Sequence, residues 1–259
     1  MSFPDSLRRE YRSLGTDAIL LAYRGSIAHG TYEPNFKPGS IDDKDAIGVC
    51  VPPLDYYFGL KQFGSRGTLE IIRDPWDIVV YEARKAISLL SKGNPNILSM
   101  LWLPEKFYIR VEPAGRRLIE QRDLFATRST FYPFMGYARS QLVRMERGAF
   151  KGYMGEKRKR LVAQYGYDTK NAAHLIRILR MGVEFLADGH MQVQRPDARE
   201  LLAIKHGEWS MKRVKSEAER LFTRAEVAYD RSKLPDKPNR EAINRLAEAV
   251  VSEALGVSE

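Results

Sequence analysis

Two aspartates, Asp43 and Asp45, stand two residues apart at the start of an apolar segment. In a β-strand, residues i and i+2 point to the same face, so these two carboxylates can share divalent cations. Mg²⁺ prefers hard oxygen ligands of this kind and often holds substrate phosphates as well. Such a site can activate an attacking hydroxyl group and stabilise a leaving pyrophosphate. Taken alone, the pair says little, because acid pairs are common in loops and at solvated surfaces.

A third carboxylate comes from Asp77, which precedes four apolar or aromatic residues in the segment DIVVY. An acid at that position is unfavourable unless it lies at a sheet edge or in a site. Glu70 and Glu82 compete for the same role. We expect Glu70 to face solvent, and Glu82 to begin a helix, where the helix dipole favours an acid without any further function.

A Gly-Ser pair, Gly25 and Ser26, directly follows the apolar segment 18–24. A turn into a helix at this point would direct backbone N–H groups at a phosphate. Glycine would also let the backbone approach the anion closely. The Gly-Ser pair at this position therefore suits a site that handles phosphates.

These residues need a sheet to position them, and the hydrophobic pattern predicts one. Strands are expected over residues 18–24, 44–51, 68–73, 77–81 and 107–110. Helices are expected over residues 3–15, 82–92, 114–125, 130–150, 156–164, 169–188, 197–205, 209–229 and 239–255. Because strands are predicted only in the first half, we expect an α+β fold. Its catalytic domain, a mixed sheet with flanking helices, would span residues 1–112, and a helical domain would span residues 113–259.

Basic residues are concentrated in one part of the chain. The whole sequence has 42 Lys and Arg against 33 Asp and Glu, a net charge of +9. Residues 136–180 hold eleven Lys and Arg against three acids, a net charge of +8. This segment favours a polyanionic partner such as RNA, DNA or a nucleoside triphosphate, although a solvated helix face would carry the same charge.

The composition excludes several classes of protein. No apolar run approaches the roughly 20 residues that cross a bilayer, and residues 1–13 lack the apolar core of a signal peptide, so no membrane partner is expected. The single cysteine, Cys50, excludes an intrachain disulfide and a cysteine-based zinc site, which favours the reducing cytoplasm. The chain also lacks the Walker A pattern of P-loop ATPases and the HExxH pattern of zinc proteases.

Four segments, in order, resemble the RNA repair pathway DNA polymerase beta family of the DNA polymerase beta-like nucleotidyltransferase superfamily: GSIAHGT, DDKDAIGV, DIVVYEARKAISLLSKGNPNILSMLW and YDTKNAAHLIRILRMGVEFL. The resemblance covers residues 18–210. It implies an enzyme that uses Mg²⁺, with Mn²⁺ as an alternative, to transfer a nucleoside monophosphate from an NTP to a hydroxyl group, releasing pyrophosphate.

The resemblance also implies residue roles. Gly25 and Ser26 would hold the triphosphate, while Asp43 and Asp45 would bind metal. Asp77 would be the third catalytic and metal-binding carboxylate, which orients or deprotonates the acceptor hydroxyl. The basic stripe of the helical domain would complete the nucleotide site, and its members lie on one predicted helix face: Lys170, His174 and Arg177.

Two departures from the superfamily pattern bear on the acid pair. The loop after Ser26 is long and contains prolines, so Asp42 could take the place of Asp43. Lys44 stands between the acids, where the superfamily often has an apolar residue. On a strand, Lys44 would point away from the face that carries Asp45.

The acceptor favoured by the basic segment is an RNA 3′ end, such as that of tRNA. A protein or small-molecule acceptor is an alternative, although the positive charge argues against a cationic aminoglycoside. A catalytically silent RNA-binding protein is a second alternative, and it would bind RNA in a salt-sensitive way without any need for the acids. The sequence leaves open the preferred base, the number of additions and the oligomeric state.

Overall fold

The computed structural model describes residues 2–34, 42–147 and 156–257. Contacts between Cα atoms divide the chain into two compact units. The first unit comprises Met1–His29, Asp43–Phe125 and Pro238–Glu259, and the second comprises Gly30–Asp42 and Ala126–Lys237. The first unit is therefore assembled from three separate stretches of sequence.

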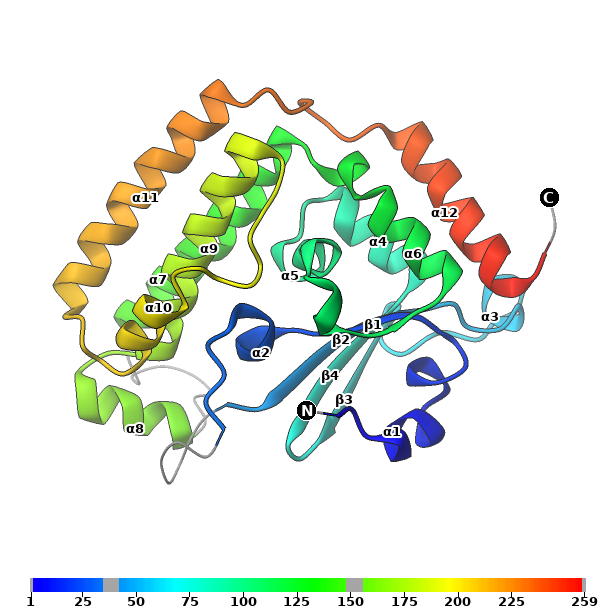
Figure 1. Ribbon diagram of the computed structural model, residues 1–259, viewed down its shortest axis with the longest axis horizontal. Helices are drawn as coiled ribbons and strands as arrows, with labels where there is room; N and C mark the ends of the chain where they lie inside the picture. The colour runs from blue at the N-terminus through cyan, green and yellow to red at the C-terminus, as the bar shows by residue number, and fades with distance from the viewer. Residues whose placement is uncertain (1, 35–41, 148–155, 258–259) are drawn as a thin grey trace. The chain divides into compact units, whose positions relative to one another are not determined.

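A five-stranded mixed sheet forms the centre of the first unit (Figure 1). The strands are β1 (Ala18–Tyr23), β2 (Lys44–Cys50), β3 (Thr68–Arg73), β4 (Trp76–Glu82) and β5 (Tyr108–Val111). Their order across the sheet is β3-β4-β2-β1-β5. β2 and β4 run parallel, whereas the other neighbouring pairs are antiparallel. The predicted strands are thus confirmed, and β2, which carries Asp45, lies between β1, which precedes Gly25, and β4, which carries Asp77.

Helices flank this sheet. They are α1 (Asp5–Glu10), α2 (Gly25–His29), α3 (Asp55–Phe58), α4 (Ala83–Ser91), α5 (Pro95–Leu98), α6 (Pro113–Glu120) and α12 (Arg240–Leu255). α12 packs against α4 and α6, and its buried residues are Ile243, Leu246 and Val250. The apolar side of this helix therefore completes the first unit.

The alternation of side chains along the strands decides which residues can form a site. One face of the sheet packs on an apolar cluster that includes Ala46, Trp76 and Ile78. Side chains of successive strand residues point to opposite faces. Asp45 and Asp77, which neighbour these core residues in sequence, therefore lie on the other face.

In the part of the second unit that the structure describes, the regular elements are all helices. Its helices are α7 (Phe131–Arg147), α8 (Glu156–Tyr165), α9 (Thr169–Asp188), α10 (Ala198–Lys205) and α11 (Met211–Arg231). α9 packs against the other four. Its N-cap is Asp168, whose side chain accepts a hydrogen bond from Asn171 N–H, and its C-cap is Gly189, which has φ +67°.

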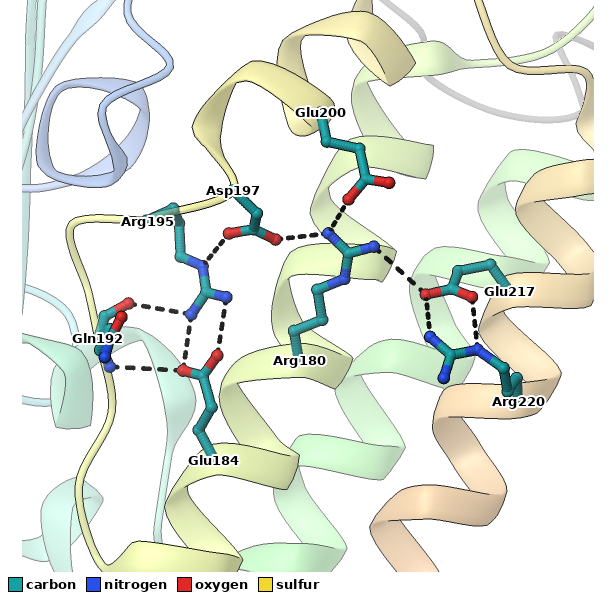
Figure 2. Close-up of polar contacts among 8 residues, drawn as sticks. All are labelled: Arg180, Glu184, Gln192, Arg195, Asp197, Glu200, Glu217 and Arg220. Carbon is teal, nitrogen blue, oxygen red and sulfur yellow. Dashed lines mark hydrogen bonds and ion pairs between the residues drawn. The ribbon is translucent and has the colours of Figure 1, made fainter.

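A network of arginines and carboxylates ties α9, α10 and α11 together (Figure 2). Arg180 of α9 forms ion pairs with Asp197, Glu200 and Glu217. Arg195, whose side chain is only 2% exposed, donates to Asp197 and to Glu184. Each arginine thus joins carboxylates from separate segments, which fixes the helices of this unit to one another.

The predicted α+β class is confirmed, since a mixed sheet with flanking helices precedes a run of helices. The two compact units differ from the predicted ranges 1–112 and 113–259, because α6 and α12 pack with the sheet unit. None of the helices in the described part of the chain is long and apolar enough to span a membrane.

Candidate active site

Two predicted acids lie side by side on neighbouring strands. β2 and β4 pair in parallel with Asp45 directly opposite Asp77. Neighbouring strands are about 4.8 Å apart, so the two carboxylates leave the same face of the sheet at the same level. Their side chains are 26% and 46% exposed, respectively, so both can be reached from solvent. The strand register thus creates a paired-carboxylate site that solvent can enter.

A cation bridges these two acids. Arg24 follows β1, and its Nη2 lies 3.4 Å from Asp77 Oδ1 and 3.9 Å from Asp45 Oδ1. Its backbone N–H also donates to the Asp45 carbonyl oxygen at 3.0 Å, which holds residue 24 against β2. Because β1, β2 and β4 are neighbours, one side chain can reach both carboxylates. Sequence reasoning missed Arg24, although a cation immediately before the Gly-Ser pair was an available signal.

Gly25 lies against the Asp45 carboxylate. It opens α2 with φ +61°, in the left-handed region that favours glycine. A Cβ atom built on it would be 2.0 Å from Asp45 Oδ2, so any other residue here would force Asp45 to move. Ser26, the next residue of α2, is partly buried. The structure therefore brings the predicted Gly-Ser pair to the predicted acid.

The two alternatives for the first predicted metal-binding acid, Asp43 and Asp42, have different surroundings. Asp43 lies just before β2 and is exposed. Asp42, in contrast, has a side chain that is only 1% exposed. It accepts a hydrogen bond from the Glu33 backbone N–H and forms an ion pair with Lys205 of α10. These contacts commit Asp42 to the second unit, so Asp43 is the better candidate.

Lys44 points away from the acids, as predicted. Its Nζ lies 5.6 Å from the centre of the Trp76 ring, which belongs to the apolar cluster on the opposite face. This placement is a cation–π contact. Lys44 therefore does not neutralise the Asp45 carboxylate.

The two competing glutamates occupy different surroundings from Asp77. Glu70 lies on β3 and is exposed, as expected. Glu82 is buried, and its carboxylate accepts hydrogen bonds from the backbone N–H groups of Arg84 and Lys85 and from the Tyr57 hydroxyl. Since Glu82 serves as the N-cap of α4, its position has a structural explanation.

The predicted basic stripe lies on α9 in the second unit. Lys170 and His174 are half-buried, whereas Arg177 is buried and contacts Met181 Sδ at 3.5 Å. Burial lowers the pKa of Arg177 to about 10. The three residues thus share one helix but differ in their access to a ligand, and their role in nucleotide binding stays a prediction.

The positive charge of residues 136–180 is divided between two environments. Exposed cations lie on α7 and α8: Arg139, Arg144, Lys159 and Arg160. Arg177 and Arg180, in contrast, belong to the interior and to the ion network of the second unit. Among the cations of this segment whose side chains the structure describes, only part is therefore exposed to a polyanion; Arg147, Lys151, Lys157 and Arg158 lie outside that set.

The donor set at Asp45 and Asp77 consists of hard carboxylate oxygens. Within residues 2–34, 42–147 and 156–257, no three His, Cys, Asp or Glu side chains converge closely enough to hold a metal ion by themselves. Two carboxylates nevertheless suit Mg²⁺, which proteins often bind through one or two carboxylates, with water and substrate phosphates as the other ligands. The arrangement can therefore hold a cation jointly with a phosphorylated substrate.

Comparison with known proteins agrees with this geometry. A model of the RNA repair pathway DNA polymerase beta family matches residues 5–249. A protein of Bacillus subtilis (strain 168), called uncharacterized protein YcgL, is 28% identical over 136 residues. That alignment covers 52% of this chain and 49% of the relative, so the two align over about half of each length. The family match covers nearly the whole chain, and the chain therefore belongs to the RNA repair pathway DNA polymerase beta family.

Proposed function

We propose that this protein transfers a nucleoside monophosphate from an NTP to a hydroxyl group at an RNA 3′ end, such as that of tRNA, and releases pyrophosphate. Family membership supports nucleotidyl transfer and a place in RNA repair. The observation that carries the proposal is the in-register pair of Asp45 and Asp77, with Gly25 packed against Asp45.

Mg²⁺ is the proposed cofactor, with Mn²⁺ as an alternative. Asp45 and Asp77 would hold the ion, and the exposed Asp43 is the proposed further ligand. When bound, the ion would supply positive charge to the phosphate oxygens, where negative charge develops during nucleotidyl transfer. The phosphate groups of the NTP would complete its ligands.

The protein's own groups would position the two substrates. Gly25 leaves room for a close approach of the backbone, and the Ser26 hydroxyl can donate a hydrogen bond to a triphosphate oxygen. Asp77 is the more exposed of the paired acids, so it is the better placed to orient or deprotonate the acceptor hydroxyl. From α9, Lys170, His174 and Arg177 are proposed to contact the nucleotide.

The favoured acceptor is RNA because exposed cations lie on α7 and α8. Cations on a surface attract the phosphate backbone without regard to sequence.

The proposed location is the cytoplasm, where Cys50 would stay reduced. Cys50 is buried, and burial raises the pKa of its thiol, which disfavours the reactive thiolate.

Labelled NTPs incubated with Mg²⁺ and tRNA test the proposal. We expect labelled RNA with the wild-type protein, and none with Asp45→Asn or after chelation of the metal. Glu70→Gln is the matched control, since it removes an exposed acid from β3 and should retain activity. Label on protein instead of RNA would show that the acceptor is a protein. RNA binding without any incorporation would indicate a silent RNA-binding protein.

A further inference from the structure

Arg24 has no role in the site described so far beyond its contacts with Asp45 and Asp77. Two carboxylates on neighbouring strands repel each other when both are ionised. An arginine is protonated at all physiological pH values, so its guanidinium offsets this repulsion. Arg24 therefore supplies the positive charge that a divalent cation would otherwise supply to the same two acids.

The contacts that hold Arg24 are loose. Charge-assisted N–H···O bonds are usually about 2.7–2.9 Å long, and arginine often binds a carboxylate through two nitrogens. Here a single nitrogen, Nη2, serves both acids, at 3.4 Å and 3.9 Å. The Nε atom of Arg24 is buried and has no hydrogen-bond partner in the part of the chain that the structure describes. This guanidinium thus lies between the acids with one long hydrogen bond, from Nη2 to Asp77, and a buried Nε that has no partner among the described residues.

We propose that Arg24 is an exchangeable counter-cation, which neutralises Asp45 and Asp77 before a divalent ion binds and yields its place when the ion arrives. The inference rests on the proposed metal-dependent function. Arg24 is a positioning residue, because it acts through the two carboxylates. It keeps the acids together in the metal-free protein, and it weakens the binding of the free metal by competing for them.

Replacing Arg24 tests this competition directly. An opposite charge within a few ångströms commonly shifts the proton-binding equilibrium of a carboxylate by tenfold or more. We therefore expect Arg24→Met to bind Mn²⁺ about tenfold more tightly than the wild type, measured by calorimetry without nucleotide. Arg24→Lys keeps the charge and should stay close to the wild type. Without metal, Arg24→Met should melt a few degrees lower, and saturating Mn²⁺ should close most of that gap.

The matched control is Arg73→Met, which removes an arginine of the same unit that pairs with Glu10. It should leave the Mn²⁺ affinity unchanged. Equal affinities in the wild type and Arg24→Met, or no Mn²⁺ binding in either, would overturn the inference. Tighter Mn²⁺ binding without nucleotide incorporation would retain the exchange and reject the proposed function. If the wild type incorporates nucleotide but binds Mn²⁺ no more weakly than Arg24→Met, the proposed function is retained and the exchange is rejected.

Discussion

Both units of this chain place arginine among carboxylates, but with different geometry. In the second unit, Arg195 is 2% exposed and contacts Glu184 through two nitrogens, at 2.7 Å and 2.8 Å, and Asp197 through Nε at 2.8 Å (Figure 2). In the first unit, Arg24 is 26% exposed and reaches its acids through one nitrogen at longer distances.

The difference distinguishes a structural network around Arg195 from a candidate active site around Arg24. A buried arginine with well-aligned partners cannot leave them without stranding charges in the interior. A partly exposed arginine with longer contacts can, on our proposal, give way to another cation. We therefore expect mutations at the Arg24 site of the first unit to change activity, and mutations in the Arg195 network of the second unit to change stability.

The largest expected effect is on activity, from Asp77→Asn. We expect turnover to fall by about 10³-fold, roughly 4 kcal/mol in activation free energy, since the acceptor hydroxyl would lose its base or orienting group. The free energy of unfolding should change by less than about 1 kcal/mol, because Asp77 is nearly half exposed. Single-turnover rates, NTP binding and urea unfolding would check this. If Asp77→Asn keeps near-normal turnover and Glu70→Gln loses it, the third catalytic acid is Glu70 on β3 and not Asp77.

The converse change is Arg195→Met, which leaves Glu184 and Asp197 without their shared arginine. We expect the protein to lose about 3 kcal/mol of unfolding free energy, because both carboxylates are partly desolvated. Arg220→Met is the control, since its side chain is 55% exposed and exposed pairs contribute roughly 0–1 kcal/mol. Equal losses in the two variants, measured by urea unfolding, would contradict the distinction between network and surface pair.

Gly25→Ala should affect stability and activity together. Gly25 and Gly256 have similar φ angles, +61° and +65°, but only Gly25 has a carboxylate where Cβ would lie. We expect Gly256→Ala to cost about 1 kcal/mol, the usual penalty of a left-handed conformation. Gly25→Ala should cost more and also lower turnover, because Asp45 must move. Thermal melts and incorporation assays on both variants would measure this, and equal behaviour would show that Asp45 adapts freely.

The smallest effect is a pH dependence of the network. Burial raises the pKa of Asp197, but hydrogen bonds from Arg195 and Arg180 outweigh it, so the pKa lies below the ordinary value. The hydrogen bond from Arg220 lowers the pKa of Glu217. A carboxyl with a depressed pKa stabilises the fold above its unfolded value, about 4, and loses that contribution as the pH falls through its folded value. Urea unfolding at pH 7 and at pH 3.5 would measure this. Between these two pH values, Glu217→Gln should lose less unfolding free energy than the wild type.

The sequence predicted the strands and the longer helices of the first unit and singled out three acids, because both depend on local pattern; the short helices α3 and α5 were not predicted. Short apolar runs that end at Gly or Pro identify strands. The Asp-x-Asp spacing lies within one predicted strand and can be recognised without knowing how that strand pairs. Asp45 and Asp77 could be singled out in this way, but their register could not, since it depends on how two distant strands pair.

The contacts of Arg24 and Asp42 lay beyond such reasoning. Arg24 meets Asp77, 53 positions away, and Lys205 meets Asp42, 163 positions away. No local periodicity encodes these pairings. The division into units was missed for the same reason, because the amphipathic pattern of α12 shows an apolar side but does not say which helices it covers.

The place of α12 has a consequence for the order in which the protein is made. Strands β1 to β5 leave the ribosome early, but the helix that covers α4 and α6 follows only after residues 126–237 have been synthesised. A chain stopped before Pro238 would contain Asp45 and Asp77, yet the apolar sides of α4 and α6 would lack their cover. Domains generally fold as units during synthesis. The first unit is therefore completed last, and a prematurely terminated chain would lack the helix that completes the unit carrying the acids.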